Sequence, residues 1–224
     1  MMRNILLGAF IIGVMAAFVS VSSADQVSYT DNINLQTTNW DNNVEIPKFD
    51  SSLGTLNWIE FTLKGHVEGT AKFENEDAQP ATVVMSLQAI MKLNRPDNTL
   101  LVTTIPLAPT SDSVTAYDGV TDYAGTSGKT YDNLTGDKTE SFTSFNPSDF
   151  ALFTGTDNII LPVFASGAST GSGAGNLALK FTTSGSAGVE VTYDYDLIPE
   201  PATMSLVAAG VLGGLAALRR RRKT

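Results

Sequence analysis

The sequence predicts an all-β protein, built as an antiparallel β-sandwich of the jelly-roll or immunoglobulin-like type. In the middle of the chain, several segments alternate apolar and polar residues with a period of two, which gives a strand one buried face and one solvated face. Residues that favour turns separate these segments. No amphipathic helix longer than about two turns is apparent between residues 25 and 198. One-sided strands at this spacing favour two antiparallel sheets packed face to face.

The first long strand is predicted between Ile59 and Phe73. Its odd positions are apolar or small, and its even positions are polar or charged. Gly65 and Gly69 interrupt the apolar face, so we expect a bulge or a corner there.

Four further segments repeat this alternation: 83–93, 159–163, 177–181 and 189–197. The run Ser184-Gly185-Ser186-Ala187-Gly188 lies between the last two segments. We expect it to form a turn that joins them as a hairpin.

The remaining segments are predicted to be one short helix and two loops. Asn146 suits a helix N-cap, Pro147 the first helical position and Gly155 the end, which predicts a helix of one or two turns up to Phe153. Residues 110–140 are rich in Asp, Gly, Ser and Thr, and we expect a long loop or short edge strands. Residues 166–175 are almost entirely Gly, Ala, Ser and Thr, which indicates a flexible loop.

Residues 1–24 have the three parts of a secretory signal peptide. Arg3 gives a basic start, residues 5–21 form an apolar core, and small residues precede a cleavage site between Ala24 and Asp25. We expect signal peptidase to cut there, and the alternative is an uncleaved signal anchor. The folded part of the chain is then predicted to be one domain, residues 25–198.

Residues 199–224 form a second signal at the other end. Pro199, Glu200 and Pro201 form a motif that cannot enter a regular helix or sheet. The apolar run from Ala202 to Leu218 would span roughly 25 Å as a single transmembrane helix, near the lower limit for a hydrocarbon core of about 30 Å. A basic tail follows and is predicted to stay cytoplasmic: Arg219, Arg220, Arg221, Arg222 and Lys223. An ordinary C-terminal tail anchor is the alternative, but it would need neither proline.

The order of motif, apolar run and basic tail resembles the PEP-CTERM sorting domain of Gram-negative bacteria. The resemblance implies cleavage near Glu200 by an exosortase, which is a membrane protease. It also implies a transient stay in the inner membrane, followed by delivery to the cell envelope or the exterior. PEP-CTERM systems are associated with exopolysaccharide, so exopolysaccharide is an implied partner.

A second resemblance covers most of residues 37–195. Three turn-forming segments, 46–56, 123–128 and 153–156, are similar to bacterial choice-of-anchor ectodomains, particularly type E. The family carries interchangeable anchors and implies no established activity.

The composition of residues 25–198 excludes several kinds of chemistry. This region holds 8 Lys and Arg against 22 Asp and Glu, a net charge of −14, so we expect no nucleic-acid partner. The chain has no cysteine, which excludes thiol catalysis, thiolate metal sites and lipid anchoring through cysteine.

Few residues suggest a catalytic or metal site. His66 is the only histidine, lies at a polar strand position and lacks a nucleophile motif, so we expect a solvated side chain. No cofactor is expected. Structural calcium is possible at the richest acidic cluster of the long loop, and plain solvated turns are the alternative. This cluster consists of Asp118, Asp122, Asp132 and Asp137.

The chain is therefore predicted to be a non-enzymatic protein with a structural or adhesive role in the envelope or extracellular matrix. The first alternative is a carbohydrate-binding module, for which Trp40 and Trp58 are the candidate stacking residues. Trp58 lies off the apolar strand face, and both edge packing and exposure remain open. The second alternative is an envelope hydrolase, which would need two carboxylates gathered in one cleft.

Overall fold

The computed structural model describes residues 24–198. The predicted signal peptide before Ala24, and the sorting motif, transmembrane helix and basic tail after Ile198, lie outside the described residues. Ten strands and one short helix follow the chain in the order β1 (Ala24–Thr37), β2 (Trp40–Pro47), β3 (Gly54–Asn75), β4 (Ala81–Asn94), β5 (Leu100–Thr104), β6 (Leu107–Val114), β7 (Gly128–Ser144), α1 (Pro147–Phe153), β8 (Asn158–Gly167), β9 (Thr170–Ser172) and β10 (Leu177–Leu197).

The strands form two antiparallel sheets, as the alternation predicts. Sheet A has the order β1-β10-β3-β7. Sheet B has the order β2-β8-β4-β5, and β6 and β9 extend it along the first half of β4. Strands early in the chain thus pair with strands late in the chain: β1 with β10, β2 with β8 and β3 with β7. This nested pairing across two sheets is the path of a jelly roll.

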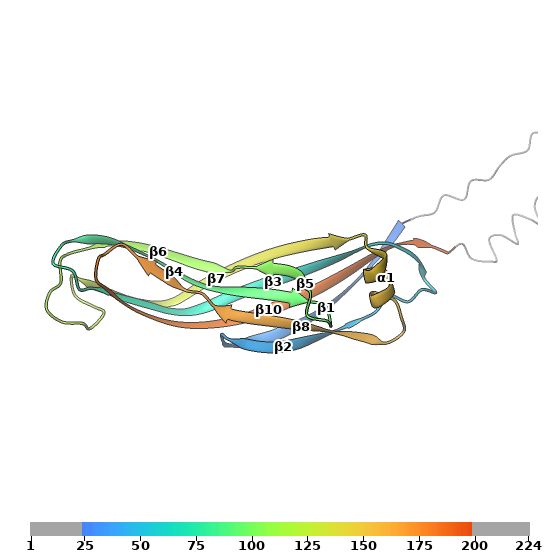
Figure 1. Ribbon diagram of the computed structural model, residues 1–224, viewed down its shortest axis with the longest axis horizontal. Helices are drawn as coiled ribbons and strands as arrows, with labels where there is room; N and C mark the ends of the chain where they lie inside the picture. The colour runs from blue at the N-terminus through green and yellow to red at the C-terminus, as the bar shows by residue number, and fades with distance from the viewer. Residues whose placement is uncertain (1–23, 199–224) are drawn as a thin grey trace, which may run out of the picture.

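The molecule is long and narrow, and its strands run along the long axis (Figure 1). We call the end that holds α1 and both described termini the proximal end. The opposite end, where residues 76–80, 115–127 and 173–176 form loops, is the distal end. The two termini meet because Ala24 pairs with Asp196 across β1 and β10.

The core lies between the sheets and consists of the apolar faces that the alternation predicts. On β3, Ile59, Phe61, Leu63 and Val67 are fully buried. The inward residues of β4 and β8 are also buried: Val83, Met85, Leu87, Ala89, Met91, Leu93, Ile159, Leu161 and Val163. At the two ends of β10 the pattern weakens, and Leu179 and Leu197 are exposed.

The expected hairpin at residues 184–188 is wrong. β10 runs straight through this segment, with Gly185 opposite Val67 of β3. A side chain at Gly185 would have its Cβ 2.7 Å from Met91 Cε of sheet B. The small residues therefore allow the two sheets to approach closely, rather than turning the chain.

Both predicted loops contain strand. Residues 110–140 form a loop, 115–127, between two edge strands, because β6 continues to Val114 and β7 begins at Gly128. In the second segment, β8 continues to Gly167 and residues 170–172 pair with β4 as β9. Polar, small residues can form these strands because they lie at sheet edges or face solvent.

Of the local predictions, the bulge is confirmed at one of its two glycines and the helix is confirmed. A bulge occurs near Gly69, where the register passes from Gly69 opposite Leu134 to Ala71 opposite Tyr131, whereas the register is continuous through Gly65. At the bulge, β7 has one residue more than β3, in the stretch that contains Asn133. Asn133 has a φ of 56°, in the left-handed region, which asparagine tolerates better than most residues. The helix α1 begins at Pro147, and the Asn146 side chain accepts a hydrogen bond from the Ser148 N–H.

Candidate functional site

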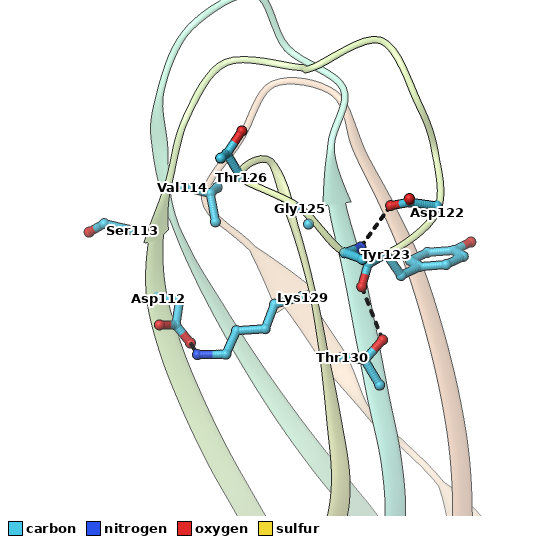
Figure 2. A pocket seen from close by; sticks show the side chains of 11 residues that line it. Asp112, Ser113, Val114, Asp122, Tyr123, Gly125, Thr126, Lys129 and Thr130 are labelled. Atoms are coloured by element: carbon cyan, nitrogen blue, oxygen red, sulfur yellow. Dashed lines mark hydrogen bonds and ion pairs between the residues drawn. The ribbon is translucent and has the colours of Figure 1, made fainter.

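The distal end contains a hollow between β6, the loop 115–127 and the start of β7 (Figure 2). Its volume is about 530 Å³, and polar groups make up most of its wall. Asp112 and Lys129 lie on one side, and Asp122 and Tyr123 lie on the other (Figure 2). A hollow of this size falls in the range of small-molecule sites.

Glu74, at the end of β3, holds the loop in place. Its side chain is fully buried and accepts hydrogen bonds from the Tyr123 N–H (2.8 Å) and the Ser127 hydroxyl (2.5 Å). Asn75 is also buried and donates to the carbonyl oxygens of Gln79 and Thr115. Buried polar groups that are fully paired rigidify a structure, so these contacts give the loop a defined shape.

This network explains one of the motifs on which the choice-of-anchor resemblance rests. Within the segment 123–128, the backbone of Tyr123 and the side chain of Ser127 bind Glu74. Gly128 pairs with Glu74 across β3 and β7, and a Cβ there would lie 2.1 Å from Glu74 Oε2. The motif is thus a structural contact for a buried carboxylate.

Inside the hollow, Asp112 takes part in an ion pair with Lys129, at 2.7 Å between Oδ2 and Nζ. The Tyr131 hydroxyl also donates to Asp112, and the Lys129 ammonium lies 5.0 Å from the centre of the Tyr131 ring. Asp122 lies on the opposite side and accepts a hydrogen bond from the Ala124 N–H (Figure 2). Two carboxylates therefore line one hollow, but each already has a partner.

The four calcium candidates do not converge. Asp118 and Asp122 accept backbone N–H groups of Val120 and Ala124, two residues further on in each case. Asp137 pairs with His66, and Asp132 lies exposed at the β7 bulge. Between Ala24 and Ile198, no group of three or more His, Asp or Glu side chains could hold a metal ion.

His66 faces outward from β3, as its polar position predicts, and its ring is hydrogen-bonded to a neighbouring strand. Its Nδ1 lies 2.7 Å from Asp137 Oδ1 on β7, and its Nε2 lies 3.9 Å from Glu68 Oε2. Ser186 is its cross-strand neighbour on β10. The sequence alone does not reveal that Asp137, His66 and Ser186 lie side by side, because their three strands come from distant parts of the chain.

The two tryptophans occupy different environments. Trp40 is 9% exposed in the core, and its Nε1–H donates to the Gly185 carbonyl at 3.3 Å. It cannot stack on an external sugar. Trp58 is half-buried on the outer face of sheet A, opposite Asp194. Of the two stacking candidates, only Trp58 remains accessible.

At the proximal end, the other two choice-of-anchor-like segments contact each other. The Phe49 N–H donates to the Phe153 carbonyl (2.8 Å), and the Gly155 N–H donates to the Phe49 carbonyl (3.0 Å). Both phenylalanines are buried, and Phe153 packs on Phe61 with ring centres 4.9 Å apart. These motifs therefore cover the proximal end of the sandwich, where both described termini lie.

The comparisons identify the C-terminal signal. Residues 197–222 match the model of the PEP-CTERM protein-sorting motif. The chain thus carries a PEP-CTERM motif, which indicates export, membrane-anchored sorting and processing by exosortase before release to the envelope or extracellular space. Within residues 24–198, no helix is long and apolar enough to cross a membrane.

No curated protein matches the chain. Among solved structures, it is similar to that of the infectious bursal disease virus Gx strain, at 16% identity over 83% of this chain and 42% of the other, with a TM-score of 0.19. It is also similar to the VP2 subviral particle of the same virus, at 13% identity over 95% and 53%, with a TM-score of 0.20. The chain spans about half the length of these structures. A likeness at such TM-scores supports no conclusion about this chain.

Proposed function

We propose that this protein is a secreted, non-enzymatic component of the cell envelope or extracellular matrix with a structural or adhesive role. Signal peptidase cuts after Ala24, and exosortase cuts at Pro199-Glu200-Pro201. The observation that supports this proposal is the PEP-CTERM motif, which begins where β10 ends at Leu197. A closed sandwich thus leads directly into a sorting signal.

The hydrogen bonds and the ion pair of the acidic side chains in the distal hollow support a non-enzymatic role. A glycosidase needs one carboxyl group free to donate a proton and another free to attack or to activate water. In the distal hollow, Asp112 is bound by Lys129 and Tyr131, and Asp122 is bound by the Ala124 N–H. Neither is placed as a free acid or base.

The second candidate function is a carbohydrate-binding module. The accessible ring of Trp58 on the outer face of sheet A favours it. Around this ring, however, the polar groups already bind one another, since Asp194 accepts hydrogen bonds from Gln26 and Asn57. Trp58 therefore offers a stacking surface with few free hydrogen-bonding groups.

The first experiment is the intact mass of the native protein after cell fractionation. We expect a chain that begins at Asp25 and ends near Glu200, found in the envelope or the medium. A Glu200→Ala variant should accumulate in the membrane with its C-terminus intact. Glu190→Ala, which changes a carboxylate outside the motif, serves as the matched control and should be processed normally.

A wild-type chain that runs through Thr224 and stays in the inner membrane would contradict the proposal. The protein would then be a tail-anchored membrane protein. Mass added at the new C-terminus would instead show transfer to a second anchor, which supports exosortase processing and excludes simple release.

A further inference from the structure

Large apolar side chains are exposed at the proximal end, around the point where the described chain ends. Leu197 and Ile198 are 42% and 54% exposed, and Leu53 is 40% exposed. The three residues are neighbours, because Leu197 pairs with Gly54 across β10 and β3 and the Ile198 N–H approaches the Leu53 carbonyl. This apolar surface therefore lies directly before Pro199 of the sorting motif.

A hollow of about 380 Å³ adjoins these residues and is lined mostly by apolar surface. One wall belongs to the segment 51–56, and the other consists of Phe150, Ala151 and Thr154, in and just after α1. The backbone hydrogen bonds of Phe49 to the end of α1 hold the two walls together. We call the segments 51–56, 150–154 and 197–198 the exit face.

The exit face contains no charged residue, although residues 25–198 hold 8 Lys and Arg and 22 Asp and Glu. The carboxylates at its border are hydrogen-bonded: Asp50 accepts from the Ser52 N–H, and Asp196 accepts from the Asn57 amide. An uncharged surface with exposed large apolar side chains is typical of a contact with a membrane or another molecule.

The chain that follows Ile198 indicates which of these the exit face meets. Only Pro199, Glu200 and Pro201 separate Ile198 from the apolar run that begins at Ala202. Four residues reach at most roughly 14 Å when fully extended. During membrane-anchored sorting, the exit face therefore lies within that distance of the lipid. So short a tether gives a high effective concentration, and a small apolar contact is then enough for binding.

We propose that, before processing by exosortase, the exit face lies on the lipid surface of the membrane, with Leu53, Leu197 and Ile198 inserted among the headgroups. Burial of their apolar area favours this contact. The lipid is zwitterionic, since the net charge of −14 on residues 25–198 disfavours anionic headgroups. The contact holds Glu200 at the height of the headgroups, where a membrane protease can reach it.

This inference rests on the proposed sorting only for its tether. The test uses the full chain in vesicles of phosphatidylcholine, and flotation confirms that each variant is bound to the vesicles. Because the chain has no cysteine, Thr55→Cys carries a nitrobenzoxadiazole dye on the exit face, and Val120→Cys carries it on the distal loop. Nitroxide groups on the lipid acyl chains quench this dye only at close range.

The dye at position 55 should emit at a shorter wavelength than the distal dye and should be strongly quenched, whereas the distal dye should not be. Added to Thr55→Cys, Leu53→Asp should lower the quenching by roughly threefold or more, because it places a charge on the exit face. Leu107→Asp is the matched control, since Leu107 is 43% exposed on β6, and should leave the quenching unchanged. Ser51→Leu should increase the quenching, a gain that misfolding does not explain.

Three results would overturn the proposal: no quenching at position 55, quenching that Leu53→Asp leaves unchanged, or a shift to shorter wavelength without quenching. In the last case protein covers the exit face. That protein is a second copy if the shift grows with the density of the chain, and exosortase if the shift needs that protease.

The failure of this inference and the failure of the proposed sorting are distinguishable. If the dye is quenched as expected but the native chain retains Thr224, processing fails while the lipid contact stands. If the native chain ends near Glu200 but position 55 is not quenched, the sorting stands and the lipid contact is wrong.

Discussion

At the residue scale, buried polar side chains hold the ends of the sandwich in place. Asp149 of α1 is 3% exposed and accepts two hydrogen bonds from Arg95, from Nε at 2.7 Å and Nη2 at 2.9 Å. The Ser144 hydroxyl donates to the same carboxylate at 2.5 Å. These contacts join the turn after β4, the end of β7 and the helix, and Glu74 has a similar role at the distal end.

Replacing Asp149 by Asn should destabilise the fold by about 3 kcal/mol, because it leaves the Arg95 guanidinium partly buried without its carboxylate. The measurement is the free energy of unfolding in urea at pH 7. Lys48→Ala, which breaks the exposed ion pair with Asp157, is the control and should cost less than about 1 kcal/mol. Equal losses in both variants would contradict a special role for Asp149.

The same variant predicts a change in acid stability. The hydrogen bonds from Arg95, opposed by burial and aided by Ser144, hold the pKa of Asp149 below its ordinary value of 3.8. A lowered pKa means that this stabilisation is complete above about pH 4 and is lost as pH falls through the folded-state pKa. The difference in stability between wild type and Asp149→Asn should therefore shrink from pH 5 to pH 2. A difference that stays constant over this range would show that the carboxylate charge does not matter.

At the scale of single elements, glycines set how closely strands approach and a cap sets where the helix begins. A Cβ added at Gly69 would lie 1.8 Å from the Thr182 carbonyl oxygen, which is backbone and cannot move aside. At Gly185 the nearest atom is the flexible tip of Met91, and the next is 3.4 Å away. These two glycines therefore differ in how much they tolerate a side chain.

Gly69→Ala should destabilise the protein by roughly 1–3 kcal/mol, because β3 must shift away from β10. Gly185→Ala should cost clearly less, since Met91 can change its rotamer. Thermal unfolding of the two variants measures the difference. A Gly185→Ala variant that is the less stable of the two would contradict this account.

Asn146→Ala should lower the stability by about 1 kcal/mol, because the Ser148 N–H loses its side-chain acceptor. Asn146→Asp keeps an acceptor at the same position and should unfold close to the wild type. Urea denaturation of both variants tests the cap. If the aspartate variant loses as much stability as the alanine variant, the side-chain hydrogen bond is not the cause.

At the scale of the whole molecule, the fold separates the end that leads to the sorting motif from the end that carries the distal hollow. Strand β3 has 22 residues, which at about 3.3 Å each makes the sandwich roughly 70 Å long. Ile198 lies at the proximal end, where its N–H approaches the Leu53 carbonyl at 3.4 Å. Before cleavage, the distal loops are thus expected to point away from the membrane.

Because the chain has no cysteine, single cysteines can report this orientation. In vesicles that hold the uncleaved chain, a dye on Ser52→Cys at the proximal end should transfer energy strongly to a membrane dye. A dye on Val120→Cys in the distal loop should transfer much less, given the length of the sandwich. Equal transfer from both positions would mean that the domain lies flat on the membrane.

The sequence by itself determined the strand faces, the helix with its cap, and the sorting signal, because each depends on residues that are neighbours in the chain. A period of two buries Phe61 and Leu63 whichever strand lies beside them. Only the tertiary structure decided that β1 pairs with β10, that residues 184–188 continue a strand, and that the segments 51–56, 150–154 and 197–198 form one exit face. These outcomes depend on packing between distant segments: Met91 of sheet B lies over Gly185, and the register of β3 against β10 places Gly54 beside Leu197. Local patterns do not encode such long-range contacts, since the same small residues suit a turn or a close approach of two sheets equally well.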